Sequence, residues 1–309
     1  RVLTRLRFLR DGRNLSEFSY ELALDRWHLG FAKISARSIA HELNLHWHRI
    51  ELLLEQMASD LSAIRMQQDL EMGEAVQRLF LPKTKSGRVG DTAFRVVFQP
   101  YGPMSGDWFQ WYQSSKGLLI AIGDVVGKGP SAALNTAVIA AVWKQCQEEA
   151  HEPERLLATM NAIVFGLFEG KQNTTVSLAW VDQKNYTLVR AGSPPWFLGG
   201  QNGMKRLPVK VTNPVGMLEE FSCQSHHGEW QPGDCLLAFS DGVIEGHQAT
   251  QRLCAEYQHH NNPDDNFLAL EAAARTAGEA SVLPDDFTLL MLQYAPKSYY
   301  SISNCYRES

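Results

Sequence analysis

The pattern of apolar and polar positions changes near Pro82. Residues 31–72 contain neither glycine nor proline, which predicts one long helix. Beyond Pro82, short apolar runs alternate with glycine, proline or asparagine, which is typical of strands joined by turns. We therefore predict a helical segment over residues 1–82, a globular domain over residues 83–295 and a loosely held polar tail over residues 296–309.

Apolar residues of the helical segment recur at alternating steps of four and three, which is the spacing of a coiled-coil seam. The seam residues are Ile50, Leu54, Met57, Leu61, Ile64, Met72, Ala75 and Leu79. Polar Gln68 interrupts the seam, and the two successive steps of four from Ile64 through Gln68 to Met72 form a stutter, which locally unwinds a coiled coil. Two interpretations stay open: a helix packed on its own domain, or a dimerising stalk over residues 50–80 that passes a signal onward. In the second, helix rotation would move Val76, Leu79 and Phe80 against the following domain.

Arginines crowd the start of the sequence beside a single acid, Asp11. They are Arg1, Arg5, Arg7, Arg10 and Arg13. Basic residues commonly flank the cytoplasmic end of a membrane span. The segment therefore fits either the flank of a membrane anchor that precedes this sequence or a solvated basic helix end, and the sequence does not distinguish the two.

The globular part is predicted to mix short strands with a few helices. We expect strands at 93–99, 107–113, 118–124, 174–181, 186–190 and 234–239, and helices at 131–149, 153–169 and 266–280. Because two of the helices come as a pair between strands, a simple βαβ repeat fits poorly. We predict an α+β fold in which antiparallel sheets form a sandwich with helices packed outside.

Composition narrows the functional classes. The 309 residues are 44% hydrophobic and 20% charged, which is globular composition. Acids outnumber bases 34 to 29, and the net charge of −5 argues against a general nucleic-acid binder. No apolar run approaches the roughly 20 residues that span a bilayer. The five cysteines are scattered without a CxxC pair, which favours a reducing, cytoplasmic location and argues against a structural zinc site.

Four segments place an aspartate beside a glycine or a second aspartate at the end of a strand. They are Ser105-Gly106-Asp107, Gly123-Asp124-Val125, Ser240-Asp241-Gly242 and Asp285-Asp286-Phe287-Thr288. A carboxylate at the tip of a buried strand is costly to desolvate unless a cation meets it. A hard divalent ion such as Mg²⁺ or Mn²⁺ removes the repulsion between neighbouring carboxylates, and glycine lets the backbone approach the ion. Together the four segments indicate a metal site.

In this order the motifs resemble those of the bacterial PPM-type serine/threonine phosphatases of the stage II sporulation protein E (SpoIIE) group, a branch of the type 2C protein phosphatases. The matching stretches are SGDWF (105–109), GDVVGKGPSAAL (123–134), SDGVIE (240–245) and DDFTLL (285–290), and the resemblance covers about residues 77–294. Residues 74–82 resemble the helix that enters this domain. Ser105 and Gln110 depart from the family pattern, which usually has glycine and an acid there.

The resemblance implies a helix-flanked αββα sandwich with two divalent metal ions, Mn²⁺ or Mg²⁺. Asp124 would bridge both ions and hold the nucleophilic water, and the carbonyl of Val125 would add a ligand. Asp241 and Asp285 would hold one ion, and Asp107 would approach the other, through water.

The implied activity is hydrolysis of phosphoserine or phosphothreonine on a regulatory protein, such as an anti-sigma-factor antagonist, under control of the helical segment. Water shared by two cations becomes hydroxide near neutral pH and attacks phosphorus in line. Two alternatives stay open: a metal-dependent phosphoesterase with a small-molecule substrate, and a non-enzymatic signalling relay.

Overall fold

The computed structural model describes residues 23–24, 27–28, 36–127, 129–149, 151–243, 246–277 and 285–296. The arginine-rich start and most of the predicted tail lie outside these residues. By its contacts the chain divides into two units, Arg1–Gln68 and Asp69–Ser309. The first unit contains β1 (Ala23–Leu24) paired with β2 (Trp27–His28), and most of helix α2 (Ala36–Phe80).

Helix α2 confirms the predicted long helix and continues to Phe80, just before Pro82, whose ring cannot extend a helix. The seam side chains that the structure describes, Met57, Leu61, Ile64, Met72, Ala75 and Leu79, are all exposed on the single chain. Those of Ile50 and Leu54 lie outside the description. Among the described residues, no helix is long and apolar enough to cross a membrane.

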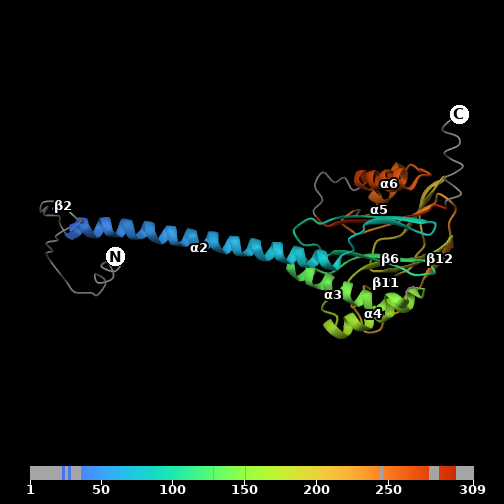
Figure 1. Cartoon of the computed structure of the whole chain (residues 1–309), viewed down its shortest axis with the longest axis horizontal. Helices are drawn as coiled ribbons and strands as arrows, with labels where there is room; N and C mark the ends of the chain where they lie inside the picture. Colours follow the sequence, from blue (N-terminus) through green and yellow to red (C-terminus); the bar gives the residue numbers. More distant parts are fainter. Residues whose placement is uncertain are drawn as a thin grey trace, which may run out of the picture. The chain divides into compact units, whose positions relative to one another are not determined.

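The second unit contains two sheets (Figure 1). The first has the order β10-β9-β13-β14-β4-β3, and the second has the order β11-β8-β7-β6-β5, with β12 also paired to β8. All these pairings are antiparallel except that of β11 with β8. The bounds are β3 (Ser86–Val89), β4 (Thr92–Gln99), β5 (Asp107–Gln113), β6 (Leu118–Asp124), β7 (Val176–Asp182), β8 (Asn185–Ala191), β9 (Phe197–Gly200), β10 (Gly203–Arg206), β11 (Val211–Thr212), β12 (His226–Glu229), β13 (Cys235–Phe239) and β14 (Phe287–Tyr294).

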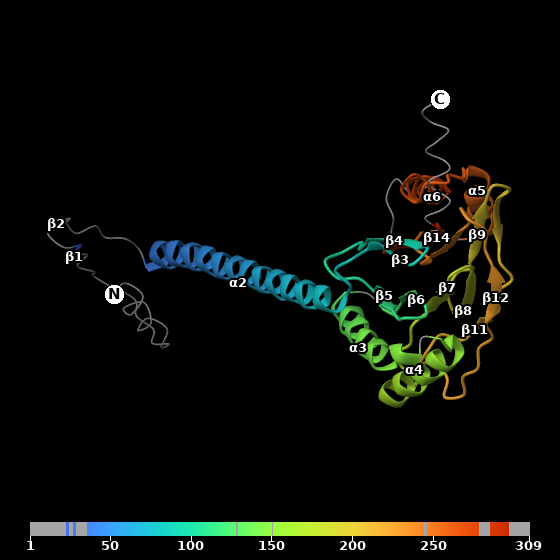
Figure 2. The ribbon, with the colours of Figure 1, turned by 45° about the vertical axis from the view of Figure 1, so that its right-hand side comes forward.

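Helices cover the outer faces of both sheets. Figure 2 shows α3 (Pro130–Cys146) and α4 (Pro153–Phe168) on the side of the β5–β8 sheet, and α5 (Gly246–Glu256) and α6 (Pro263–Ala277) on the opposite side. A 3₁₀ turn, η2 (Gln147–Glu149), follows α3. Helices α3, α4 and α6 each begin at a proline, whose missing N–H costs nothing in the first turn.

Alternation along the central strands explains the layers. In β6, Leu119 and Ala121 belong to the cluster of side chains formed with α3 and α4, whereas Leu118, Ile120 and Ile122 belong to the cluster between the sheets. Strand β14 alternates in the same way between the inter-sheet cluster and that under α5 and α6. Because successive side chains of a strand point to opposite faces, a strand buried on both faces is apolar throughout. The predicted α+β sandwich with outer helices is confirmed.

Each of the predicted strands corresponds to an observed one: β4, β5, β6, β7, β8 and β13. In the second unit the prediction missed the eight-residue strand β14 and the short strands β3, β9, β10, β11 and β12. Of the short strands, β3, β9, β10 and β12 carry glycine, so alternation is weak in them. The predicted helix at 266–280 begins earlier, at Pro263, and its last predicted residues lie outside the description.

Candidate metal centre

Two of the predicted ligands lie opposite each other at one end of the β5–β6 pair. Asp107 is the register partner of Asp124. Directly opposed side chains of an antiparallel pair share one face of the sheet, with Cβ atoms about 4.5–5.5 Å apart. The carboxylates of Asp107 and Asp124 therefore come together because each begins or ends its strand in the same register.

The other two predicted ligands lie at neighbouring strand ends of the second sheet. The backbone of Ser240, after β13, is paired with Thr288 of β14: the Ser240 N–H donates to the Thr288 carbonyl at 2.9 Å. Gly242 packs against the next turn, because an added Cβ would collide with the Asp286 carbonyl and lie 3.1 Å from the Asp285 Cβ. Glycine thus lets the turn that carries Asp241 lie directly against Asp285.

Asp286 joins the two sheets. Its Oδ1 accepts the N–H of Tyr101 and its Oδ2 accepts the N–H of Gly106, both at 2.8 Å. These bonds tie the start of β14 to the turn that precedes β5. All four acidic segments are therefore brought to one place, and both oxygens of Asp286 are already used by backbone amides.

Several oxygen atoms surround the α-carbon of Gly106. A Cβ there would lie 2.7 Å from Oδ1 of Asp124, 3.2 Å from the Val125 carbonyl oxygen and 3.3 Å from the Gly127 carbonyl oxygen. The strand end that carries them is fixed, because the Asp124 carbonyl accepts the Thr175 N–H at 2.8 Å and the Thr174 hydroxyl at 2.9 Å. Carboxylate and carbonyl oxygens are the ligands that Mg²⁺ and Mn²⁺ prefer.

Among the predicted metal ligands, Asp107 has the least favourable electrostatic environment. Its side chain is 1% exposed, and within the described part of the chain its Oδ2 has no hydrogen-bond partner. Burial raises its pKa well above the usual range, the charge of Asp124 raises it further, and the hydroxyls of Thr288 and Ser240 act in the opposite direction. A buried anion beside a second anion is costly, and a cation at this point would offset that cost. These oxygens fit a divalent cation.

The predicted residues thus gather as two opposed carboxylates, one carbonyl and two carboxylates on the facing sheet. Across the described residues, no three Asp, Glu, His or Cys side chains lie close enough together to hold an ion by themselves. Sequence reasoning missed the part played by Asp286 and by the Gly127 carbonyl. The resemblance already favoured Asp285 as the ligand of the adjacent pair, but the contacts that Asp286 makes with backbone amides are visible only in the structure.

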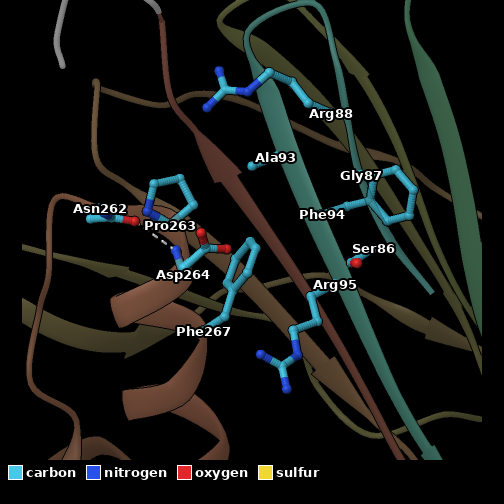
Figure 3. Close-up of a pocket in the computed structure, with 10 residues that line it drawn as sticks. All are labelled: Ser86, Gly87, Arg88, Ala93, Phe94, Arg95, Asn262, Pro263, Asp264 and Phe267. Carbon is cyan, nitrogen blue, oxygen red and sulfur yellow. Dashed lines mark hydrogen bonds between the residues drawn. The ribbon is translucent and has the colours of Figure 1, made fainter. Parts of the chain in front are cut away.

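A pocket of about 540 Å³ lies elsewhere, between β3, β4 and the start of α6 (Figure 3). Its lining residues are Ser86, Gly87, Arg88, Ala93, Phe94, Arg95, Asn262, Pro263, Asp264 and Phe267. None of the predicted metal ligands is among them. Arg95 at its edge is paired with Glu271 at 3.3 Å. The acidic site therefore does not coincide with this pocket.

The chain is similar to known phosphatases along most of its length. It is 25% identical over 242 residues to Phosphoserine phosphatase RsbU of Bacillus subtilis (strain 168), which covers 73% of this chain and 70% of the relative. It spans only 39% and 26% of two matching proteins named Stage II sporulation protein E, from Priestia megaterium and from Bacillus subtilis (strain 168).

Solved structures share the fold. The SiaA-PP2C domain of Pseudomonas aeruginosa has a TM-score of 0.62 at 18% identity and covers 75% of this chain and 98% of that one. RsbX, solved in complex with magnesium, has a TM-score of 0.54 at 16% identity and covers 68% of this chain and 98% of that one. The expected PPM-type (type 2C) fold is confirmed. A family profile described as Stage II sporulation protein E (SpoIIE) matches residues 114–295. The chain belongs to the Stage II sporulation protein E (SpoIIE) family.

Proposed function

We propose that this chain is a metal-dependent protein serine/threonine phosphatase that acts on a phosphorylated regulatory protein. The observation that carries the proposal is the pair Asp107 and Asp124, opposed in register. The buried Oδ2 of Asp107 has no hydrogen-bond partner among the residues that the structure describes, and the Val125 carbonyl lies close to Asp124. Relatives named Phosphoserine phosphatase RsbU and RsbP support the reaction class. Magnesium in the RsbX structure supports a divalent ion.

The proposed site would hold two ions, Mn²⁺ or Mg²⁺. Asp124 would contact both, Val125 would contribute its carbonyl, Asp241 and Asp285 would hold one ion, and Asp107 would approach the other. Asp286 is left out of this set, because its two oxygens accept the amides of the turn before β5.

When bound, the ions would supply an activated water and offset charge on the phosphoryl oxygens. The residues of the chain do the positioning. Thr174 and Thr175 fix the backbone of Asp124, while Ser240 and Thr288 pair the strand ends behind Asp107 and Asp285. Fixed carboxylates would hold the ions, and the ions would in turn hold the phosphoryl group and the water in one geometry, which is where most of the acceleration in phosphoryl transfer arises.

The decisive experiment compares two substrates. Phosphate release from a phosphoserine-containing anti-sigma-factor antagonist protein should require Mn²⁺, stop with a chelator and be lost in Asp124→Asn. Release from nucleotide monoesters should stay low. Equal turnover of nucleotides would favour the small-molecule phosphoesterase, and no turnover of either with Mn²⁺ bound would favour the non-enzymatic relay.

We also propose that α2 joins two copies through residues 50–80. The exposed Met57, Leu61 and Ile64 share the seam spacing, and an apolar stripe of this kind is stabilised by a second helix. Light scattering of the full chain at micromolar concentration should give a dimer. Leu61→Glu should give a monomer, whereas Met66→Glu, an exposed site off the seam, should not. A monomeric parent chain would refute the stalk.

We further propose that α2 controls the activity of the metal centre. Gln68→Leu should continue the seam and favour one packing, and a coupling of about 1–3 kcal/mol would change turnover roughly 5- to 150-fold. Of the three residues expected to move against the domain, Phe80 is half-buried. Val76 and Leu79 are 47% and 75% exposed, whereas Gln77 between them is buried. If Gln68→Leu is still a dimer and its turnover stays within about twofold of the parent, the stalk only tethers the two copies and does not control the site.

A further inference from the structure

Gln77 is a buried polar residue in a helix turn whose neighbours are exposed. Its side chain belongs to the part of α2 in the second unit and is only 5% exposed. Its Nε2 donates to the Ser105 carbonyl at 2.6 Å, and its Oε1 accepts the Ser105 N–H at 3.1 Å. One side-chain amide therefore pairs with both backbone groups of a single residue, as a neighbouring strand would.

The third hydrogen bond fixes the amide itself. Nε2 also donates to the hydroxyl of Thr136 on α3 at 2.8 Å, and that hydroxyl donates to the Ala133 carbonyl at 2.8 Å. Because the hydroxyl proton is used by Ala133, the Thr136 oxygen is left as an acceptor, which orients the Gln77 side chain. Both N–H groups and the oxygen of the amide are thus engaged.

The position of Ser105 in turn fixes the position of Asp107, the proposed metal ligand. Ser105 is fully buried, so its backbone groups need partners inside the protein. Its Oγ accepts the N–H of Asp107 at 3.0 Å, two residues along. On the far side, Gly106 is held by Asp286. The turn is clamped at both ends, and Asp107 follows directly from it.

We propose that Gln77 is a positioning residue: its amide sets the backbone of Ser105 and thereby places the Asp107 carboxylate in the metal centre. The proposal rests on the proposed function for the metal, but the placement of the turn does not depend on a metal. A second contact supports the same path, since Nε2 of Gln110 on β5 donates to the carbonyl of Phe80, the last residue of α2, at 2.7 Å. The end of α2 is thereby attached to the turn before Asp107 and to β5 after it.

The test uses three variants of the full chain. Gln77→Met keeps the length of the side chain but removes all its hydrogen bonds. Thr136→Val removes only the bond to α3 and keeps the Ser105 bonds, so it measures the cost of loosening the helix contact alone. Gln113→Met changes an exposed glutamine at the far end of β5 and serves as the matched control.

Two readouts separate positioning from general stability. In metal-free protein, amide hydrogen exchange over residues 104–108 should be at least about tenfold faster in Gln77→Met, because the buried Ser105 groups lose their partners. In calorimetric titration, its Kd for Mn²⁺ should rise about tenfold. Thr136→Val should change both by less than Gln77→Met does, because the Ser105 bonds remain, and Gln113→Met should stay within about twofold of the parent.

Exchange and Mn²⁺ affinity of Gln77→Met within about twofold of the parent would overturn the proposal. Equal changes in Gln77→Met and Thr136→Val would overturn it as well, because they would indicate helix packing alone. A parent chain that binds no Mn²⁺ would instead refute the proposed function. A parent that binds Mn²⁺ only as tightly as Gln77→Met does would refute only the role of Gln77.

Discussion

Replacing Asp107 with asparagine should stabilise the metal-free protein and remove its response to metal. The parent side chain is buried, lies opposite Asp124 and leaves Oδ2 without a partner among the described residues. An asparagine side chain at this position would have nearly the same shape, carry no charge and offer an N–H group toward the neighbouring carboxylate. Since an unpaired buried polar group costs about 1–3 kcal/mol, the Asp107→Asn variant should gain about that amount in a chelator.

Added metal should offset this advantage of the variant. Metal at about 100 times its Kd stabilises a protein that binds it only when folded by about 2.7 kcal/mol. The parent should gain this, and Asp107→Asn should gain much less. Because 1 kcal/mol shifts the midpoint of a domain of this size by about 2–4 °C, the variant should melt about 2–12 °C higher in chelator and lose that advantage in Mn²⁺.

The pH dependence gives a second check. Burial first, and the charge of Asp124 next, hold the folded-state pKa of Asp107 well above its usual range. A raised carboxyl pKa means that the associated stability is present below the unfolded-state pKa and is lost as pH rises through the folded-state pKa. In chelator the advantage of Asp107→Asn should therefore be smallest near pH 4 and grow toward neutral pH.

Thermal unfolding in chelator and in Mn²⁺, at several pH values, measures all three effects. Asp69→Asn, at an exposed position of α2, is the control and should change neither curve. An Asp107→Asn variant that is less stable than the parent in chelator, or that gains as much from Mn²⁺, would refute the reasoning.

Three further predictions concern the same site. Asp124→Asn should abolish phosphate release while the circular dichroism spectrum stays native, and near-parental turnover in excess Mn²⁺ would contradict its central place. Asp285→Asn should reduce turnover severely and Asp286→Asn less so, because the introduced side-chain amide keeps one acceptor for the turn. Turnover assays with excess Mn²⁺ measure this, and a larger loss in Asp286→Asn than in Asp285→Asn would exchange the roles of the two residues. Gly106→Ala should weaken Mn²⁺ binding in calorimetry, because its Cβ would lie 2.7 Å from Oδ1 of Asp124; unchanged affinity would mean that this oxygen is not a ligand.

The local pattern of apolar and polar residues was enough to predict much of the fold. The central strand β6 is a run of apolar residues up to Gly123 because both of its faces are buried, and such a run is visible without a structure. The long helix α2 follows from the absence of glycine and proline over residues 31–72. Short edge strands such as β10 and β12 escaped detection, because an edge strand with glycine and charged residues has little alternation to read.

For the metal centre, too, the sequence determined one part and the tertiary structure the other. The sequence by itself determined which segments carry the acids, because a carboxylate next to glycine at a strand end is a local feature. Only the tertiary structure decided that Asp107 faces Asp124, that Asp286 holds a turn of the other sheet, and that Gln77 is the buried residue of its helix turn. Each of these depends on a partner far along the chain, as Gln77 depends on Ser105. Periodicity reports which face of an element is buried, but the partner of a buried polar group is set by packing between elements.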